Sequence, residues 1–165
     1  MMFSELVKEA HATALEKGWH EGEDRSLNRA GALIALMHSE VVEASAEYFG
    51  VPLAEELADV VIRLADAVGW LGWEVDDFDL ADIWCPAARK GSAIDVHRML
   101  VAFGTDAIRH HGKPLPRVGV EVASACEAWR RDAVIFGKAP SLLDAIKTKL
   151  AKNKTRSFRH GGKLL

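Results

Sequence analysis

Two short acidic motifs limit the fold of this chain more than any other feature of its sequence. The first is the E-x-x-E of Glu40 and Glu43, and the second is the E-x-x-D of Glu56 and Asp59. Residues three apart in a helix project from the same face, so each motif places two carboxylates on one side of a helix. The segment between the motifs contains Gly50-Val51-Pro52, which is typical of a turn. The sequence therefore predicts an antiparallel helical hairpin with four facing acids.

The four carboxylates need a compensating charge, because acids held this close raise one another's pKa. Paired glutamates are also common on solvated helix faces, where they bind nothing. Here, however, both pairs lie in largely apolar stretches, residues 32–46 and 57–71, and the first stretch has no basic side chain other than His38. Ligand sets made of oxygen alone favour Mg²⁺, with Mn²⁺ as the alternative. We therefore predict a metal site whose ligands are Glu40, Glu43, Glu56 and Asp59.

The rest of the chain also follows helical spacing rather than strand alternation. No Asn-Gly or Asp-Gly turn lies between alternating stretches, as it would in a β-hairpin. The predicted helices run from Phe3 to Lys17, Leu27 to Tyr48 (N-cap Ser26), Pro52 to Trp70, Asp76 to Trp84, Ala93 to His110, Val118 to Phe136 and Leu142 to Lys154 (N-cap Ser141). We expect an all-α helical bundle, with residues 1–165 as a single domain.

Composition narrows the classes of partner. A net charge of −3 gives no general attraction to nucleic acid or to anionic membranes. Residues 1–17 contain charged side chains rather than a secretory apolar segment, and no apolar run in the sequence is long enough to cross a membrane. Cys85 and Cys126 lack the C-x-x-C spacing of a metal or redox motif, so we expect reduced, buried thiols. These features predict a cytoplasmic protein that binds neither nucleic acid nor membrane.

The C-terminal segment is basic. Residues 147–163 contain seven Lys or Arg and no acid, and Lys149, Asn153 and Arg156 fall close to one line on a helix. Such a segment also suits a helix C-terminus that complements its dipole. Nucleic-acid binding is less well supported, because Phe158 is the only aromatic residue in the run. A phosphate clamp accounts best for the mixture of Arg, Lys and Asn.

The predicted clamp continues beyond Arg156. His160 and Lys163 flank two glycines that allow close approach of the backbone to a ligand. No G-x-x-x-x-G-K-[ST] phosphate loop is present, so helix side chains and metal must hold the phosphates. Together the acids and the basic line predict a site for a metal–polyphosphate complex.

These motifs, in this order, resemble those of the MazG-like, all-α nucleoside triphosphate pyrophosphohydrolases. The resembling segments are His38 to Glu43, Glu55 to Arg63, and the spaced residues Lys149, Asn153, Arg156 and His160 to Lys163, with Gly18-Trp19 upstream. Residues 70–143 contribute no motif. The resemblance implies Mg²⁺-dependent cleavage of a nucleoside triphosphate between its α and β phosphates, giving monophosphate and pyrophosphate. It also implies a homodimer or homotetramer with active sites near the subunit contacts.

Several roles follow from this hypothesis. One glutamate, with Glu40 and Glu43 as candidates, orients or deprotonates the attacking water. Trp19 and His38 are the candidates for contact with the nucleobase, although a Trp after a helix-ending Gly is as often a packing residue. Two acids further along the helices, Glu47 and Asp66, are interpreted as surface residues, with a supporting role at the metal as the alternative.

Two other functions remain open. A di-metal carboxylate redox bundle is disfavoured because no Glu-x-x-His motif is present. A non-enzymatic helical binding module is the second alternative. Apolar residues beyond the hairpin independently suggest an oligomer, because uncovered apolar patches tend to mark interfaces. They are Trp70, Leu71, Trp73, Met99, Leu100, Phe103, Val134, Ile135 and Phe136.

Overall fold

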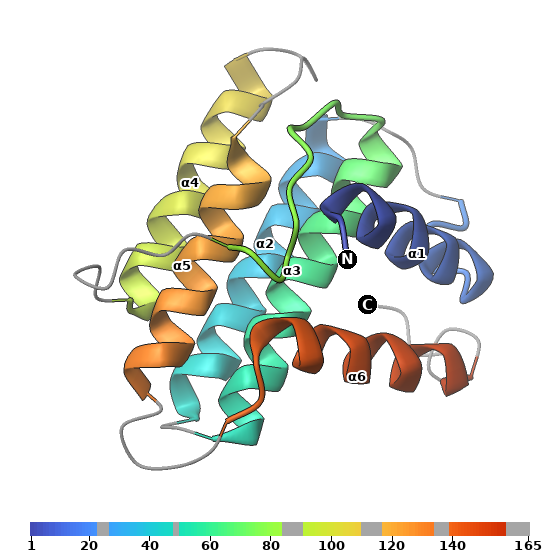
Figure 1. Ribbon diagram of the computed structural model, residues 1–165. Helices are drawn as coiled ribbons and strands as arrows, with labels where there is room; N and C mark the ends of the chain where they lie inside the picture. The colour runs from blue at the N-terminus through green and yellow to red at the C-terminus, as the bar shows by residue number, and fades with distance from the viewer. Residues whose placement is uncertain (23–26, 48–49, 84–90, 110–116, 134–138, 158–165) are drawn as a thin grey trace.

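The computed structural model describes residues 1–22, 27–47, 50–83, 91–109, 117–133 and 139–157 (Figure 1). These residues form six helices and one isolated β-bridge. The helices are α1 (Phe3–Glu16), α2 (Leu27–Ala46), α3 (Val51–Leu71), α4 (Ala93–Arg109), α5 (Val118–Ala133) and α6 (Leu142–Thr155). The prediction of an all-α helical bundle is therefore confirmed.

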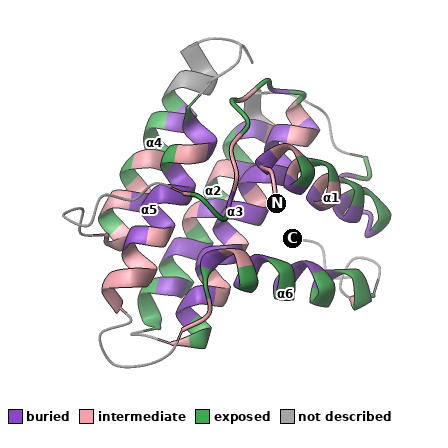
Figure 2. Ribbon diagram, in the orientation of Figure 1, coloured by how far each residue is buried: buried purple, intermediate pink, exposed green. Residues whose placement is uncertain are grey.

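Helix α3 lies at the centre of this bundle. It packs against α1, α2, α5 and α6, while α4 packs against α2 and α5. Figure 1 shows α2, α3, α4 and α5 side by side, with α1 and α6 on another side of α3. Apolar residues surround α3 on most of its circumference, and Figure 2 shows most of its surface as buried. A helix that is apolar nearly all round belongs in a core, so its few polar side chains must find partners on neighbouring helices.

Local signals explain the ends of α3. Gly50 precedes it with a φ of 86°, a conformation that suits glycine, and Pro52 follows in the first turn. Gly72 ends the helix in the left-handed conformation, with a φ of 66°. The hairpin of α2 and α3 therefore forms where the sequence predicts it. At α6, Ser141 Oγ accepts a hydrogen bond from the Asp144 N–H, as expected of an N-cap.

The prediction of a helix from Asp76 to Trp84 is wrong for the residues that the structure describes. Residues 73–78 have no regular structure, and Asp79 forms an antiparallel bridge with Met2. The Phe3 N–H donates to the Phe78 carbonyl oxygen, and the Leu80 N–H donates to the Met1 carbonyl oxygen. This segment is held by pairing with the start of α1, which local periodicity does not reveal.

The other predicted helices agree with the structure to within about two residues at their described ends, which is the usual uncertainty of helix boundaries. Ser26, Tyr48, Trp84, His110 and residues 134–136 lie outside the described residues.

Cys126 is a buried free thiol, as predicted, and burial raises its pKa; Cys85 is outside the described residues. Among the described helices, none combines the length and the apolar character needed to cross a membrane.

The apolar residues that suggested an oligomer contribute mainly to the core of this chain. Leu100 and Phe103 are fully buried, and Trp73 packs edge-on against Phe103 with ring centroids 5.0 Å apart. A single core cluster draws side chains from all six described helices. The homodimer or homotetramer therefore stays a prediction from the resemblance. Among the residues whose burial is described, the large apolar side chains that are exposed are Leu15, Val42, Val51, Ile94 and Val101.

Candidate metal and phosphate site

The hairpin brings its acids together. One carboxylate oxygen from each of Glu40, Glu43 and Glu56 lies within 4.8 Å of the other two. Glu40 and Glu43 project from α2, whereas Glu56 projects from α3. Asp59, one turn along α3, is close enough for its charge to raise the pKa of both Glu40 and Glu56. The four predicted ligands therefore face one another across the two helices.

Two basic side chains already balance part of this charge. Arg63 Nε donates to Glu40 Oε1 over 2.5 Å, from the next turn of α3 beyond Asp59. Lys149 of α6 donates from Nζ to Asp59 Oδ2 over 2.7 Å. The interpretation of the acids as lacking basic partners was therefore wrong. That argument considered only the neighbouring residues of α2, whereas the partners come from α3 and from the last helix.

Burial sets the protonation of these groups. Burial raises the pKa of Glu40 above its usual value; the charges of Asp59 and Glu43 add to this effect, and Arg63 opposes it. Burial also raises the pKa of Glu56, with Lys149 opposing the change and Asp59 adding to it. For Lys149, burial alone would lower the pKa, but its hydrogen bond to Asp59 and the nearby acids raise it overall. Lys149 therefore stays a cation. The ionised forms of Glu40 and Glu56, by contrast, are less favourable here than in water.

The donor set fits a divalent cation. The site contains five carboxylates, counting Glu55, whose Oε2 lies 3.7 Å from Lys149 Nζ, and two cations. Three negative charges remain after pairing, and a divalent ion would neutralise most of them. Glu43 is exposed and forms no ion pair within the described part of the chain, so the cluster is open to solvent on one side. Carboxylate oxygens beside solvent are the setting that Mg²⁺ uses, because it retains several of its waters.

The predicted phosphate-binding residues are only partly brought together. Lys149 and Asn153 lie one turn apart on the buried face of α6, each with 4% of its surface exposed. Asn153 Oδ1 has no hydrogen-bond partner among the described residues. Helix α6 ends at Thr155, so Arg156 caps the helix with an extended ψ of 146° instead of continuing the helical line. His160 and Lys163 lie outside the described residues.

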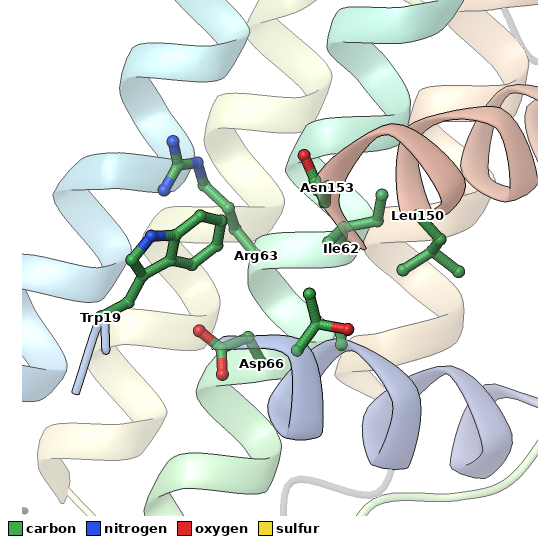
Figure 3. Close-up of a pocket in the computed structure, with 8 residues that line it drawn as sticks. Trp19, Ile62, Arg63, Asp66, Leu150 and Asn153 are labelled. Atoms are coloured by element: carbon green, nitrogen blue, oxygen red, sulfur yellow. The ribbon is translucent and has the colours of Figure 1, made fainter. Parts of the chain in front are cut away.

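The two candidates for base contact occupy separate places. Trp19 is half-buried and lines a pocket with Arg63, Asp66 and Asn153 (Figure 3). The pocket has a volume of about 20 Å³, which is enough for roughly one water molecule. A nucleobase would enter only if this pocket opened. His38 lies away from the pocket, where its Nδ1 is 2.6 Å from the Nδ1 of His97 on α4 and the rings stack at 4.9 Å.

The histidine pair joins α2 to α4 and has its own electrostatic signature. Burial lowers the pKa of His38, and the neighbouring His97 lowers it further. One nitrogen must donate and the other accept, so at least one ring is neutral in this contact. The bond commits the Nδ1 of His38 to another helix, which leaves Nε2 as the ring atom with which His38 would contact a ligand.

Sequence reasoning missed Arg63 as a member of the site. The signal for it was present, since Arg63 follows Asp59 by four residues and Glu56 by seven and therefore shares their helix face. It also missed His11, His20 and the burial of Asp66, which is 8% exposed instead of lying on the surface. Glu47, by contrast, is exposed, as interpreted.

The chain was compared with models of protein families, with curated proteins and with solved structures, and none of the three comparisons gives a match. The resemblance to the MazG-like enzymes therefore rests on the motif residues themselves.

Proposed function

We propose that this protein is a Mg²⁺-dependent nucleoside triphosphate pyrophosphohydrolase that releases pyrophosphate and a nucleoside monophosphate. The observation that carries the proposal is the convergence of Glu40, Glu43 and Glu56 to within 4.8 Å, with Lys149 of α6 against the same cluster. Converging carboxylates suit a hard divalent cation, and the adjoining Lys and Asn suit phosphate oxygens. A triphosphate bound through magnesium would need both.

The acids divide the work according to their partners. Arg63 holds the carboxylate of Glu40, and Lys149 holds that of Asp59, so both are fixed in position. Glu43 is exposed and forms no ion pair within the described residues, so its carboxylate is free to orient the attacking water and accept its proton. Magnesium, when bound, would neutralise phosphoryl oxygens and lower the pKa of a bound water.

Lys149 and Asn153 would receive the departing pyrophosphate. The Lys149 ammonium has three N–H donors, and the 2.7 Å bond to Asp59 uses one of them. Its contacts to Glu56 and Glu55, at 3.6 and 3.7 Å, are longer than hydrogen bonds, so the other donors are uncommitted. Because the Lys149 side chain is only 5% exposed, phosphate oxygens would reach these donors once the site opens. Asn153 lies one turn further along α6 and offers its amide N–H groups. Stabilisation of charge that develops on the leaving group lowers the barrier to cleavage.

The direct test is a panel of canonical and modified nucleoside triphosphates incubated with Mg²⁺, with the products separated by ion-exchange chromatography. We expect monophosphate and pyrophosphate in equal amounts, and no turnover in EDTA. Diphosphate and orthophosphate would show cleavage at the other anhydride and would refute the proposal. Binding of triphosphates without turnover of any of them would instead favour the non-enzymatic binding module.

A matched pair of variants tests the role of Glu43. Glu43→Gln removes the proposed base and should lower kcat by about 10²–10⁴-fold, the usual contribution of a general base. Glu47→Gln makes the same change at an exposed position just beyond α2 and should leave kcat unaltered. Equal activity of the two variants would assign the water to another group, with Glu40 as the remaining candidate.

A further inference from the structure

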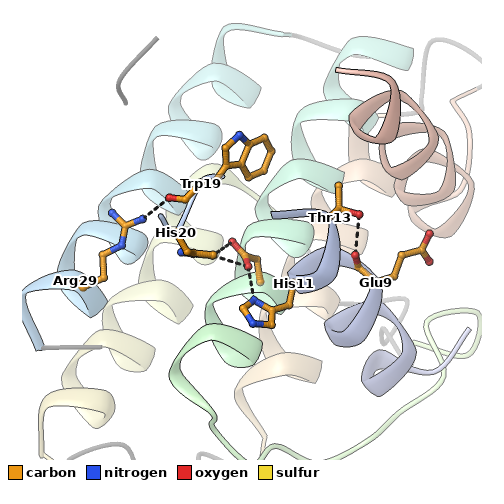
Figure 4. Close-up of polar contacts among 7 residues, drawn as sticks. Glu9, His11, Thr13, Trp19, His20 and Arg29 are labelled. Carbon is orange, nitrogen blue, oxygen red and sulfur yellow. Dashed lines mark hydrogen bonds and ion pairs between the residues drawn. The ribbon is translucent and has the colours of Figure 1, made fainter. Parts of the chain in front are cut away.

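A second polar cluster lies on α3, two turns beyond Asp59, and consists of His11, His20 and Asp66. His11 Nδ1 lies 3.1 Å from Asp66 Oδ1, and His20 Nε2 lies 2.9 Å from each Asp66 oxygen. The histidines come from α1 and from the turn that follows it, and Figure 4 shows both rings directed at one carboxylate. The side chains of His20 and Asp66 are 1% and 12% exposed. Three chain segments therefore converge on one buried carboxylate.

The three side chains provide two imidazole nitrogens and a carboxylate oxygen within 4.8 Å of one another. Two histidines and a carboxylate form a ligand set for Zn²⁺ and related transition-metal ions, whereas Mg²⁺ prefers oxygen alone. With bonds of about 2.0–2.1 Å, the ligand atoms of a tetrahedral site are about 3.3 Å apart. The observed separations of 2.9 and 3.1 Å would need to widen by only a few tenths of an ångström.

The surroundings hold the ligands in place. The ring of His20 stacks on Trp70, with centroids 4.2 Å apart and planes 6° from parallel. Gly69 makes room for His11, because a Cβ at position 69 would lie 2.7 Å from the Cβ of His11. Both rings are therefore positioned before any ion arrives, which reduces the cost of binding one.

A water in the neighbouring pocket is the candidate for a fourth ligand, although of the three protein ligands only Asp66 lines that pocket. Asp66 lines the pocket of about 20 Å³ beside Trp19, and that volume holds roughly one water. Three protein ligands and one water make a complete tetrahedral set. We propose that His11, His20 and Asp66 form a binding site for a transition-metal dication such as Zn²⁺, separate from the acidic cluster of α2 and α3.

The proposal also predicts the strength of binding. Coordination through Nε2 moves the ring proton of His20 to Nδ1, and that atom is buried with no hydrogen-bond partner among the described residues. A missing partner for the second nitrogen typically weakens metal binding about 10–100-fold. We therefore expect a site of moderate affinity for Zn²⁺, weaker than a structural zinc site.

Calorimetric titration with Zn²⁺ in excess Mg²⁺, together with visible absorption of the Co²⁺ form, tests the site. We expect one Zn²⁺ per chain and the intense bands of four-coordinate Co²⁺. His11→Ala and Asp66→Asn should each weaken Zn²⁺ binding by tenfold or more. Gly69→Ala retains all three ligands but displaces His11, so it should weaken binding as well. Circular dichroism checks that each variant is folded, and His11→Ala decides the test if Asp66→Asn does not fold.

Two controls separate this site from other sites on the chain. His97→Ala removes a half-buried histidine elsewhere and should leave Zn²⁺ binding unchanged. The double variant Glu43→Gln with Glu56→Gln disables the acidic cluster and should also leave it unchanged. Zn²⁺ binding that persists in folded His11→Ala, that is lost in the double variant, or that Mg²⁺ displaces would overturn the proposal, as would no binding at all.

Discussion

Replacement of Lys149 by methionine would show how far this one cation stabilises the acidic cluster. Its Nζ lies 2.7 Å from Asp59 Oδ2 and 3.6 Å from Glu56 Oε1, and its side chain is only 5% exposed. Methionine has a similar length and apolar character, so Lys149→Met removes the charge while largely retaining the packing against α3. Among the described residues, the cation that would remain paired with the cluster is Arg63, through Glu40.

The size of the effect follows from burial. A hydrogen bond between charged groups contributes about 1.5–3 kcal/mol, and loss of one partner of a buried pair costs about 3–5 kcal/mol. The Asp59 side chain is 18% exposed and so retains some contact with water. We therefore expect Lys149→Met to lower the free energy of unfolding by about 2–3 kcal/mol in EDTA, which is the upper part of the range for a charged hydrogen bond and below the cost for a fully buried pair.

The measurement is urea unfolding followed by circular dichroism, with Lys154→Met as the matched control on the same helix. Lys154 also has a close acidic partner, with Nζ 2.6 Å from Glu9 Oε1, but its side chain is 55% exposed. An exposed pair contributes about 0–1 kcal/mol, so the control should change little. If Lys149→Met costs no more than Lys154→Met, the reasoning that links burial to this ion pair is refuted.

The stability that Mg²⁺ adds to Lys149→Met provides a second test. A ligand that binds only the folded state stabilises it in proportion to the logarithm of its concentration above Kd. Loss of Lys149 leaves the cluster more negative and should tighten Mg²⁺ binding, so the variant should gain more stability from Mg²⁺ than the wild type does. An equal gain in both proteins would show that magnesium binds elsewhere.

Two further predictions concern stability alone. Gly91→Ala should destabilise the fold by about 1–3 kcal/mol or more, because a Cβ there would lie 1.9 Å from the backbone nitrogen of Trp129. Gly31→Ala, in an open helical position, should instead stabilise by about 0.5–1 kcal/mol in thermal unfolding, and equal effects would contradict this contrast. Asp77 accepts hydrogen bonds from Ser4, and the one from the Ser4 backbone N–H contributes most to holding the pKa of Asp77 below its usual value. The ionised Asp77 therefore stabilises the fold above the unfolded pKa, and this contribution is lost as pH falls through the folded pKa. Wild type should therefore lose more stability than Asp77→Asn between about pH 7 and about pH 3 in urea titrations, and parallel losses would rule this contribution out.

The sequence predicted the hairpin well because its determinants are local. Gly50 and Pro52 mark the turn, and the three-residue spacing within each acidic motif determines the face on which its carboxylates lie. Neither feature depends on the rest of the chain. The same spacing could not reveal that Lys149, ninety residues from Asp59, would lie against it, because that contact depends on how α6 packs across α3.

Two predictions that were wrong, the helix from Asp76 to Trp84 and the exposure of Asp66, also failed because contacts between distant segments decide these features. Residues 76–83 contain apolar and acidic side chains at spacings compatible with a helix, but their backbone and carboxylates pair with residues 1–4, just before α1 and in its first turn. Asp66 was interpreted as a surface acid, because its position on its own helix gives no sign that other segments cover it. The two histidines that contact it come from α1 and the following turn, more than forty residues earlier. Local patterns indicate which face a residue occupies but not which segment covers that face.

Helix α3 connects both proposed sites through a single row of polar side chains. Glu56, Asp59, Arg63 and Asp66 follow one another at spacings of three, four and three residues, so they share one face of an otherwise apolar helix. Each turn of this row meets a different neighbour: Lys149 of α6 at Asp59, Glu40 of α2 at Arg63, and the two histidines at Asp66. The partners determine the chemistry, because oxygen ligands at one end suit magnesium and imidazoles at the other suit zinc. Arg63 lies between the two ends and also lines the pocket that Asp66 shares. A change in the Arg63–Glu40 ion pair would therefore alter the surroundings of both Glu40 and Asp66.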